Sequence, residues 1–215
     1  KVVGPNPNAY ATVHNRFKSL ALAASSGLAR PETILIKQED GLPITYFPCL
    51  IKPVFLLAII EDEPQYFSER KVNSSYALDA KLRDDLPRCD IMLQAPVEGE
   101  TVELNICAVE GILLGITVAV MLHESSKVGS SYRKSGEVTP KILAIAEAIA
   151  HKLRWTGFMA IECKSQGNEL WVTDIRPYPS DSLSLSRFSG VDLPKLLLDR
   201  FVGENNVDVV ISNKN

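Results

Sequence analysis

Two carboxylates, Glu162 and Asp174, stand on either side of a Gly167-Asn168 turn signal, each within an apolar, strand-like segment. In an antiparallel hairpin closed near that turn, the two residues face each other and project from one face, with their Cβ atoms within about 5.5 Å. Facing carboxylates repel each other unless a cation lies between them, and Mg²⁺ prefers such oxygen ligands. The spacing therefore allows a metal site, and on spacing alone an acidic pair on a solvated sheet face that Lys164 neutralises is the more ordinary alternative.

Two basic residues, Lys52 and Arg176, are placed where they could bind an anion. Lys52 lies in an otherwise apolar, strand-like run, CLIKPV, and a buried lysine needs an anionic partner, either a phosphate or an internal carboxylate. Arg176 lies in the segment DIRPYPSDSLSLS, where its guanidinium could clamp an oxyanion bidentately or pair with a surface acid. Both alternatives stay open for each residue.

Several helices and strands must position these residues. Apolar periodicity of the helical kind predicts helices over residues 12–26, 74–85, 140–155 and 193–202. Runs rich in Val, Ile and Leu predict strands over residues 33–37, 46–54, 90–93, 101–111, 111–122, 158–164 and 169–177. Residues 61–71 are expected to form a loop or edge region, and residues 124–138 a polar loop. Strands joined as hairpins predict an α+β fold in two parts, with a boundary near Pro96.

Composition narrows the classes of function. The chain has 215 residues, of which 46% are hydrophobic and 23% charged, as in ordinary globular proteins. The net charge of −3 and the aromatic content of 7% argue against a nucleic-acid-binding surface. The longest apolar run, residues 111–122, is too short to span a bilayer, and the four cysteines are scattered without a metal-binding spacing. We therefore expect a cytoplasmic protein with neither a nucleic-acid nor a membrane partner.

Taken in order, the segments resemble the ATP-grasp superfamily of ligases, which join a carboxylate to an amine or a thiol. The resemblance covers nearly the whole chain and is carried by NRFKSLALAASSGLARPETI, FPCLIKP, SSYALDAKL, LQAPVEGETVELNI, WTGFMAIECK, VTDIRP and SLSLSRFSGVDLPKLLLD. It implies two α+β subdomains with mainly antiparallel sheets and a nucleotide cleft between them. By this resemblance, residues 1–14 are a linker from an absent preceding domain, residues 15–95 are a small lid subdomain, and residues 96–215 are the C-terminal subdomain with the metal site.

The resemblance also implies ATP and Mg²⁺ (or Mn²⁺) as cofactors, and it gives particular residues a role in binding the nucleotide. The side chain of Gln94 and the backbone of Val97 would contact the adenine, and Glu100 would bind the ribose. Lys52 and Arg16 would hold the phosphates, with Arg16 standing where the family has a lysine. These roles are implied by the resemblance alone.

The remaining matched positions concern the metal and the phosphates. Glu162 and Asp174 would hold the divalent cation between the phosphates. Arg176 stands where the family has a metal-binding asparagine, and as a catalytic residue it would instead hold a phosphate or acyl-phosphate oxygen. Tyr178 stands where the family has an arginine. The family's glycine-rich phosphate loop should follow Pro53, but the sequence there, VFLLAIIEDEP, contains no glycine.

Three functions follow from these observations. The first is an ATP-dependent ligase, in which ATP phosphorylates a small-molecule carboxylate and an amine (or thiol) substrate displaces phosphate from the acyl phosphate. A partner domain or a partner chain would then supply the missing front domain. The second is a catalytically degenerate ATP-grasp-like module that binds a nucleotide or a protein partner, which the missing glycines and Arg176 favour. The third is an acidic-surface interaction protein unrelated to the ATP-grasp enzymes.

Overall fold

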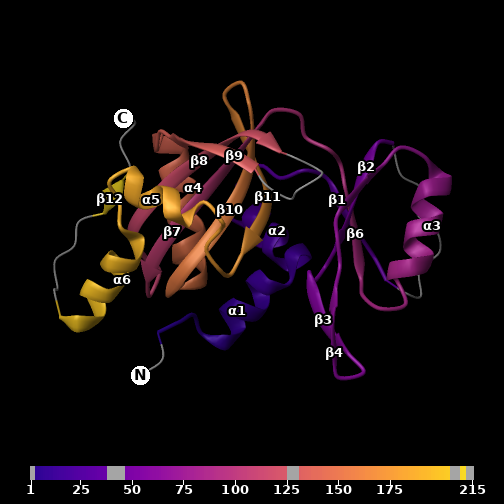
Figure 1. Cartoon of the computed structure of the whole chain (residues 1–215), viewed down its shortest axis with the longest axis horizontal. Helices are drawn as coiled ribbons and strands as arrows, with labels where there is room; N and C mark the ends of the chain where they lie inside the picture. Colours follow the sequence, from indigo (N-terminus) through magenta and orange to yellow (C-terminus); the bar gives the residue numbers. More distant parts are fainter. Residues whose placement is uncertain (1–2, 38–46, 125–130, 204–208, 212–215) are drawn as a thin grey trace.

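The computed structural model describes residues 3–37, 47–124, 131–203 and 209–211. These residues form two unequal parts, and Figure 1 shows a large sheet with its helices on the left and a small sheet with one helix on the right. Most strand pairs are antiparallel, so the α+β class predicted from the sequence is confirmed. Within the described residues, no helix is both long enough and apolar enough to cross a membrane.

The large sheet has the strand order β11-β10-β7-β8, and β9 and β12 each pair with a different part of β8. Its strands are β7 (Glu100–Val109), β8 (Ile112–Glu124), β9 (Ser131–Gly136), β10 (Gly157–Gln166), β11 (Glu169–Arg176) and β12 (Val210–Ile211). Along β7, Val102, Leu104 and Ile106 enter the main apolar core, whereas Glu103 and Asn105 alternate with them. The alternation gives the sheet one apolar face and one face that carries buried polar groups.

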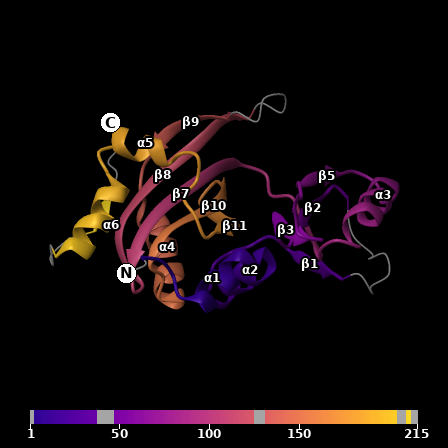
Figure 2. The ribbon, with the colours of Figure 1, turned by 60° about the horizontal axis from the view of Figure 1, so that its bottom comes forward.

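Helices cover both faces of the large sheet (Figure 2). The apolar face packs against α1 (Pro7–His14), α2 (Arg16–Ser25) and α4 (Pro140–Leu153). The helix α4 begins with Thr139 as its N-cap and presents Ile142, Ile145 and Ile149, spaced three or four residues apart, to the core. A smaller apolar cluster on the other face holds α5 (Leu183–Phe188) and α6 (Leu193–Val202).

The small sheet is antiparallel, with the strand order β1-β6-β2-β5, and one helix packs on it. Its elements are β1 (Thr33–Ile36), β2 (Cys49–Pro53), β5 (Arg70–Val72), α3 (Ser75–Asp85) and β6 (Ile91–Gln94). Leu78 and Leu82 of α3 are buried against Ile51 and Ile91 of the sheet. This separate apolar cluster holds the small part together and places the ends of β2 and β6 beside the large sheet.

The predicted helix over residues 12–26 is interrupted at Asn15. The residue has extended backbone and caps α2, since its side chain accepts from the backbone N–H of Lys18. The break separates α1 from α2, and both helices pack on the large sheet through Val13 and Leu20. The helical pair therefore lies with residues that the sequence assigned to the C-terminal subdomain.

The region over residues 61–71, expected to be a loop or an edge, contains strands, among them β5 at the edge of the small sheet, and the polar loop expected over residues 124–138 contains a strand as well. Residues 57–66 form a hairpin of β3 (Leu57–Ile60) and β4 (Glu63–Tyr66), and β9 lies within the polar stretch 124–138, of which residues 125–130 are outside the described residues. Polar side chains hid β4 and β9 from a prediction based on apolar alternation, whereas β3 is apolar but leads into a turn that has neither glycine nor asparagine. The start of the predicted strand 46–54 also lies outside the described residues, and the strand there is β2.

Candidate functional site

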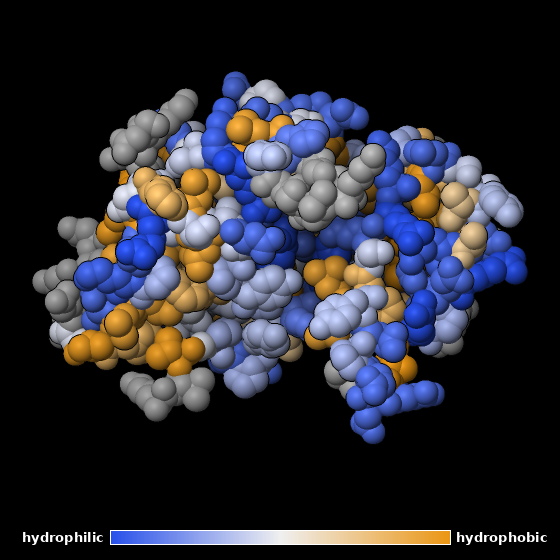
Figure 3. All heavy atoms as spheres, in the orientation of Figure 1, coloured by the Kyte–Doolittle hydropathy of each residue, from blue (hydrophilic) through white to orange (hydrophobic). Residues whose placement is uncertain are grey.

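A cleft of about 580 Å³ lies between the small sheet and the large sheet. The strands β2 and β6 contribute Lys52 and Gln94, the connection between the sheets contributes residues 96–99, and β10 and β11 contribute Glu162 and Thr173. Figure 3 shows hydrophilic side chains gathered where the two parts meet. The fold thus brings Lys52, Gln94 and Glu162, which the resemblance singled out from distant segments, to the walls of one cleft.

The strands β10 and β11 place Glu162 opposite Asp174, which confirms the pairing predicted from the turn between them. The pairing depends on an irregularity of register just after Glu162, which leaves Thr173 as an extra residue in β11. Such a bulge locally re-aims side chains. The hydroxyl of Thr173 donates to Oε1 of Glu162 at 2.8 Å, while the next residue, Asp174, reaches the same group of charges. The bulge therefore helps to assemble the site.

The guanidinium of Arg176 lies between the two carboxylates. Its Nη2 is 2.8 Å from Oε2 of Glu162, and its Nε is 3.3 Å from Oδ2 of Asp174. Its Nη1 is 3.5 Å from Oε2 of Glu103 on β7. Repulsion between the facing carboxylates is thus relieved by an arginine of the same hairpin, and not by Lys164, whose amine donates to a hydroxyl of β7.

Asp174 is only 2% exposed, and Arg16 at the start of α2 holds it from the other side. Nε and Nη2 of Arg16 donate to Oδ1 and Oδ2 of Asp174, both at 3.1 Å, and Nη2 also donates to Oε1 of Glu69 at 2.7 Å. Burial acts to raise the pKa of the Asp174 carboxyl, but Arg16, Lys52 and Arg176 together outweigh it and lower the pKa below its ordinary value. Asp174 is therefore an anion at neutral pH.

Lys52 is 3% exposed and has an internal carboxylate as its partner. Its Nζ lies 3.4 Å from Oε2 of Glu69 and 3.5 Å from the backbone carbonyl oxygen of Thr173. Burial acts to raise the pKa of Glu69, but the charges of Arg16 and Lys52 outweigh it and lower the pKa. Glu69 lies in the stretch expected to be a loop or edge region, so the sequence predicted that Lys52 needs an anion without identifying which one.

Gln94 is fully buried at the cleft end of β6 and has one unsatisfied atom. Its Nε2 donates to the backbone carbonyl of Thr173 at 3.3 Å, whereas its Oε1 has no hydrogen-bond partner within the described part of the chain. A buried acceptor without a partner costs roughly 1–3 kcal/mol. A ligand that donates a hydrogen bond to this oxygen would remove that cost.

The connection after β6 forms another wall of the cleft, and Val97 and Glu98 both line it. Gly99 has a φ of +123°, and a Cβ there would overlap the carbonyl oxygen of Ser165, so only glycine allows this close approach to β10. Glu100 is exposed at the start of β7 and is not among the residues that line the cleft. Its ribose-binding role stays a prediction, and Glu98 is a lining carboxylate that sequence reasoning missed.

The arrangement of these carboxylates does not fit a divalent cation. Mg²⁺ demands near-octahedral oxygen ligands at about 2.1 Å. The oxygens of Glu162 and Asp174 on the side of the guanidinium are already bonded to Arg176, which has no acceptor atom to offer a metal. No group of three or more His, Cys, Asp or Glu side chains is placed to hold a metal in the described ranges.

A buried polar layer beneath Arg176 was also missed at the sequence level. Oε1 of Glu103 accepts from the hydroxyl of Ser182 at 2.7 Å and lies 3.6 Å from Nη1 of Arg133. The amide of Asn105 donates to the same Ser182 hydroxyl at 2.8 Å. The alternation in TVELNICAV carried a signal for this layer, because it places Glu103 and Asn105 on the face opposite the apolar core.

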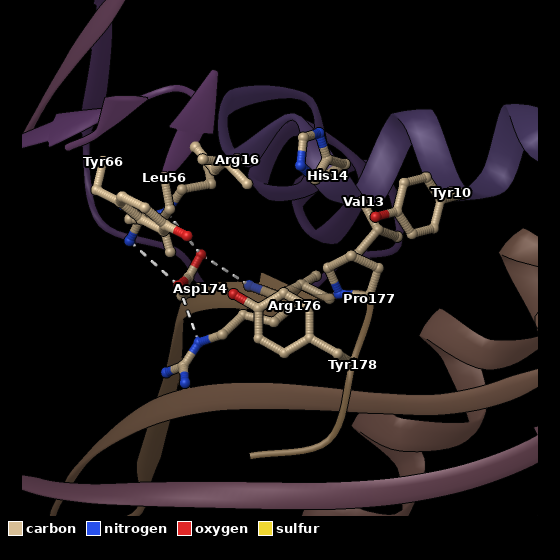
Figure 4. A pocket seen from close by; sticks show the side chains of 12 residues that line it. Tyr10, Val13, His14, Arg16, Leu56, Tyr66, Asp174, Arg176, Pro177 and Tyr178 are labelled. Carbon is tan, nitrogen blue, oxygen red and sulfur yellow. Dashed lines mark hydrogen bonds and ion pairs between the residues drawn. The ribbon is translucent and has the colours of Figure 1, made fainter. Parts of the chain in front are cut away.

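A second cavity, of about 410 Å³, lies beside the same ion pairs. Figure 4 shows Asp174 joined to Arg16 and Arg176, with the ring of Tyr178 close by. The remaining walls are mostly apolar or aromatic and include Tyr10, Val13, His14, Leu56, Leu57, Tyr66, Ile175 and Pro177. The chain therefore places a polar cleft and a largely apolar cavity on either side of one network of charges.

The hairpin β3–β4 occupies the position where the resemblance predicts a glycine-rich phosphate loop. Its turn residues, Glu61 and Asp62, have φ values of 52° and 62°, a conformation that glycine or asparagine usually supplies. The ladder pairs Leu57 with Tyr66 and Ile60 with Glu63. Because pairing commits backbone N–H groups to the partner strand, this hairpin is a poor cradle for phosphates.

No family model matches the sequence. The chain is 24% identical over 219 aligned residues to the carbamoyl phosphate synthase large chain of Vibrio cholerae, covering 94% of this chain and 20% of that protein. It is 20% identical to the multifunctional protein CAD of Squalus acanthias, covering 95% of this chain and 10% of that protein. The chain thus spans a fifth or less of these curated relatives.

Solved structures match this chain over a larger share of their own length than the curated relatives do. The D-alanine–D-alanine ligase of Bacillus anthracis, complexed with ATP, superposes with a TM-score of 0.69 at 12% identity, covering 92% of this chain and 68% of that one. The N5-carboxyaminoimidazole ribonucleotide synthetase of Thermus thermophilus gives a TM-score of 0.60 at 15% identity, covering 85% and 50%. The chain therefore has the fold of the ATP-grasp ligases, which confirms the fold that its motifs predicted.

Proposed function

We propose that this chain is the nucleotide-binding part of an ATP-dependent ligase that joins a small-molecule carboxylate to an amine or a thiol. The fold of the ATP-grasp ligases supports the proposal, and so does the similarity to carbamoyl phosphate synthase. The observation that carries it is the buried, unpaired Oε1 of Gln94 in a cleft that also contains Lys52. The amino group of adenine is a donor that suits this acceptor, and a cleft of about 580 Å³ is of the size that holds such ligands.

In the proposed complex, the adenine lies against Gln94 and Val97, and the phosphates extend toward Lys52. Lys71 and Lys164 also line the cleft and add positive charge along this path. Charge-assisted hydrogen bonds from such amines to phosphate oxygens are stronger than bonds between neutral groups. The ribose would then lie near Glu98 or Glu100, of which Glu98 lines the cleft.

The reaction proposed here asks the protein mainly for position and charge. A carboxylate oxygen of the substrate attacks the γ-phosphorus of ATP, ADP leaves, and an acyl phosphate forms. The amine nitrogen then attacks the carbonyl carbon, inorganic phosphate leaves with the bonding electron pair, and the nitrogen loses a proton to solvent. Arg16, Lys52 and Arg176 supply positive charge beside the phosphoryl group. The cavity of about 410 Å³ next to Arg176 is the place proposed for the second substrate.

Magnesium, which the resemblance predicts at Glu162 and Asp174, takes part in no step of the proposed reaction. The two carboxylates would be its ligands, and when bound it would offset phosphate charge. In this structure, however, Arg176 takes the oxygens that such an ion would need. The proposed reaction therefore relies on the chain's own cations at this position.

A second candidate is a catalytically degenerate module that binds a nucleotide or a protein partner without turnover. Two observations favour it, namely the paired β3–β4 hairpin in place of a glycine-rich loop and the guanidinium between the two carboxylates. Both candidates bind ATP in the same cleft, and they differ in whether ADP is produced. In either case a further domain or a partner chain is proposed to complete the substrate site, because the chain spans a fifth or less of the curated relatives it matches.

The test combines ATP binding with ADP formation. Isothermal titration should show ATP binding to the wild-type chain, with at least tenfold weaker binding to Lys52→Ala and no change for the matched control Lys152→Ala, an exposed lysine of α4. ADP release in the presence of a panel of carboxylates and amines would then favour the ligase, and binding without release would favour the module. Equal ATP affinity of Lys52→Ala and the wild type would contradict both.

A further inference from the structure

Three strands of the large sheet each deliver one carboxylate to the guanidinium of Arg176. Glu162 comes from β10 at 2.8 Å, Asp174 from β11 at 3.3 Å and Glu103 from β7 at 3.5 Å. Each carboxylate meets a different nitrogen, so the whole fork of the guanidinium is used. The side chains of Arg176 and Glu162 are 22% and 24% exposed, and those of Asp174 and Glu103 are 3% and 5% exposed, so two of the three carboxylates lie away from solvent.

The position of the guanidinium coincides with the position that a bridging cation would need. An ion bound to Glu162 and Asp174 must lie within about 2.1 Å of an oxygen from each. Oε2 of Glu162 and Oδ2 of Asp174 instead lie at hydrogen-bonding distance from Nη2 and Nε of the same side chain. A metal ion and the guanidinium cannot share this space, and their like charges would repel each other.

The balance of acidic and basic residues around Arg176 also leaves no place for a metal ion. Glu69, Glu103, Glu162 and Asp174 form one network with Arg16, Lys52, Arg133 and Arg176, and the two sets are equal in number. Arg16 is engaged by Asp174 and Glu69, and Arg133 lies nearest Glu103. Among the described residues, Arg176 is the ion-pair partner of Glu162, so loss of Arg176 would leave the Glu162–Asp174 side of the network with excess negative charge.

We propose that Arg176 is a built-in cation that bridges Glu162, Asp174 and Glu103, so that this carboxylate pair binds no divalent ion and the cleft binds a nucleotide without one at this position. The proposal goes beyond the proposed function, because its metal-binding half holds whether or not the chain turns over ATP. The resemblance predicts a metal-binding asparagine where this chain has Arg176. The proposal explains this difference, since asparagine offers an oxygen to a metal whereas arginine offers only hydrogen-bond donors.

The test measures Mn²⁺ binding to the intact chain without nucleotide, by electron paramagnetic resonance of the free ion. The wild type should bind no Mn²⁺ at this pair, and Arg176→Asn should bind about one ion per chain. The double variant Arg176→Asn/Glu162→Gln should lose that ion again. Arg83→Asn, which removes an exposed guanidinium from α3, serves as the matched control and should behave as the wild type.

A second variant keeps the test decisive if the first is unstable. Arg176→Lys retains a positive charge at the position and should exclude Mn²⁺, and added Mn²⁺ should raise the melting temperature of Arg176→Asn but not of Arg176→Lys. Wild-type binding of Mn²⁺ that Glu162→Gln abolishes would overturn the proposal. Failure of folded Arg176→Asn to bind Mn²⁺ would overturn it as well, because the guanidinium would then not be what excludes the ion.

The nucleotide half is tested separately, by titration of ATP with Mg²⁺ and with a chelator. The wild-type affinity should change less than threefold between the two conditions, whereas that of Arg176→Asn should rise at least tenfold with Mg²⁺. A wild type that needs Mg²⁺ as strongly as Arg176→Asn would overturn the proposal while leaving the proposed function intact. Absence of ATP binding in every condition would instead overturn the proposed function and the nucleotide half, and the Mn²⁺ result would still decide the metal half.

Discussion

Replacing Asp174 with asparagine should strongly destabilise the fold. The carboxylate is 2% exposed and accepts two hydrogen bonds from Arg16 at 3.1 Å and one from Arg176 at 3.3 Å. The neutral amide removes the only buried anion that Arg16 pairs with bidentately among the described residues. Breaking a buried ion pair by removing one partner costs about 3–5 kcal/mol, because the other charge loses its compensation, and Arg16 would keep only Glu69, whose side chain is 43% exposed. We expect a loss within that range for Asp174→Asn.

The assay is urea unfolding followed by tryptophan fluorescence, to which the buried Trp155 contributes together with Trp171. Asp79→Asn, which removes the half-buried partner of the exposed Arg83 on α3, is the matched control and should leave the unfolding midpoint nearly unchanged. The double variant Arg16→Met/Asp174→Asn should lose at least about 1 kcal/mol less than the sum of the single losses, since it removes both partners of the buried pair together. A loss under about 1 kcal/mol for Asp174→Asn, or an additive cycle, would refute the reasoning.

The same pair sets a dependence on pH. Burial acts to raise the pKa of Asp174 in the folded chain, but Arg16, Lys52 and Arg176 outweigh it and lower the pKa. Between the folded and the unfolded pKa of this carboxyl, the folded state therefore binds fewer protons than the unfolded state. The stabilisation is then complete above the unfolded pKa, about 3.9, and is lost as the pH falls through the folded pKa. The difference in unfolding free energy between the wild type and Asp174→Asn should stay constant from about pH 8 to 5 and shrink below about pH 4.

Three further predictions concern other parts of the molecule. Gln94→Leu should reduce the preference for ATP over GTP about tenfold in competition titrations, because it removes the buried acceptor proposed to meet the adenine amino group; an unchanged preference would place the base elsewhere. Gly99→Ala should destabilise the chain by about 2–3 kcal/mol in urea unfolding and weaken ATP binding. Gly99 has a φ of +123°, and the added Cβ would overlap the backbone of Ser165. A variant that unfolds and binds ATP as the wild type does would show that the turn can move. Burial raises the pKa of Cys107 and of Cys163 to about 12, so neither thiol should react with iodoacetamide at pH 8 until the chain unfolds, as mass spectrometry would show.

The carboxylate pair was predictable because it depends on local signals. The Gly167-Asn168 turn signal and the alternation of the flanking strands place Glu162 opposite Asp174 by short-range geometry alone. A regular two-residue hairpin would nevertheless have paired Glu162 with Thr173. The bulge leaves Thr173 as an extra residue, so that Glu162 pairs with Asp174 instead. Local signals therefore indicated the right pair, while the bulge that achieves it depends on packing in three dimensions.

The need of Lys52 for an anion was also predictable, since burial of a lone ammonium is costly. The identity of that anion was not, because Glu69 lies in a polar stretch without a periodic pattern, far from Arg16 and Asp174 in sequence. The location of the Arg176 guanidinium follows from three strands converging, which no local pattern encodes. Local periodicity thus predicts elements, and long-range convergence decides which charges meet.

The hairpin β3–β4 shows a different reason for a missed element. Strand pairing there is achieved without a glycine or asparagine at the turn, where Glu61 and Asp62 adopt positive φ. The usual turn signal is therefore missing from the sequence, although the strands on either side form. The same absence of glycine is what distinguishes this position from a phosphate-binding loop.

The position of the nucleotide is tested most directly by photolabelling with 8-azido-ATP, followed by peptide mapping. The base is expected to lie against Gln94 and Val97, so the label should fall on the peptide that contains residues 94–99 and should disappear when ATP is added in excess. The label should also be lost in Lys52→Ala, because the phosphates hold the base in place. A label on another part of the chain, or one that excess ATP does not prevent, would contradict nucleotide binding in the cleft.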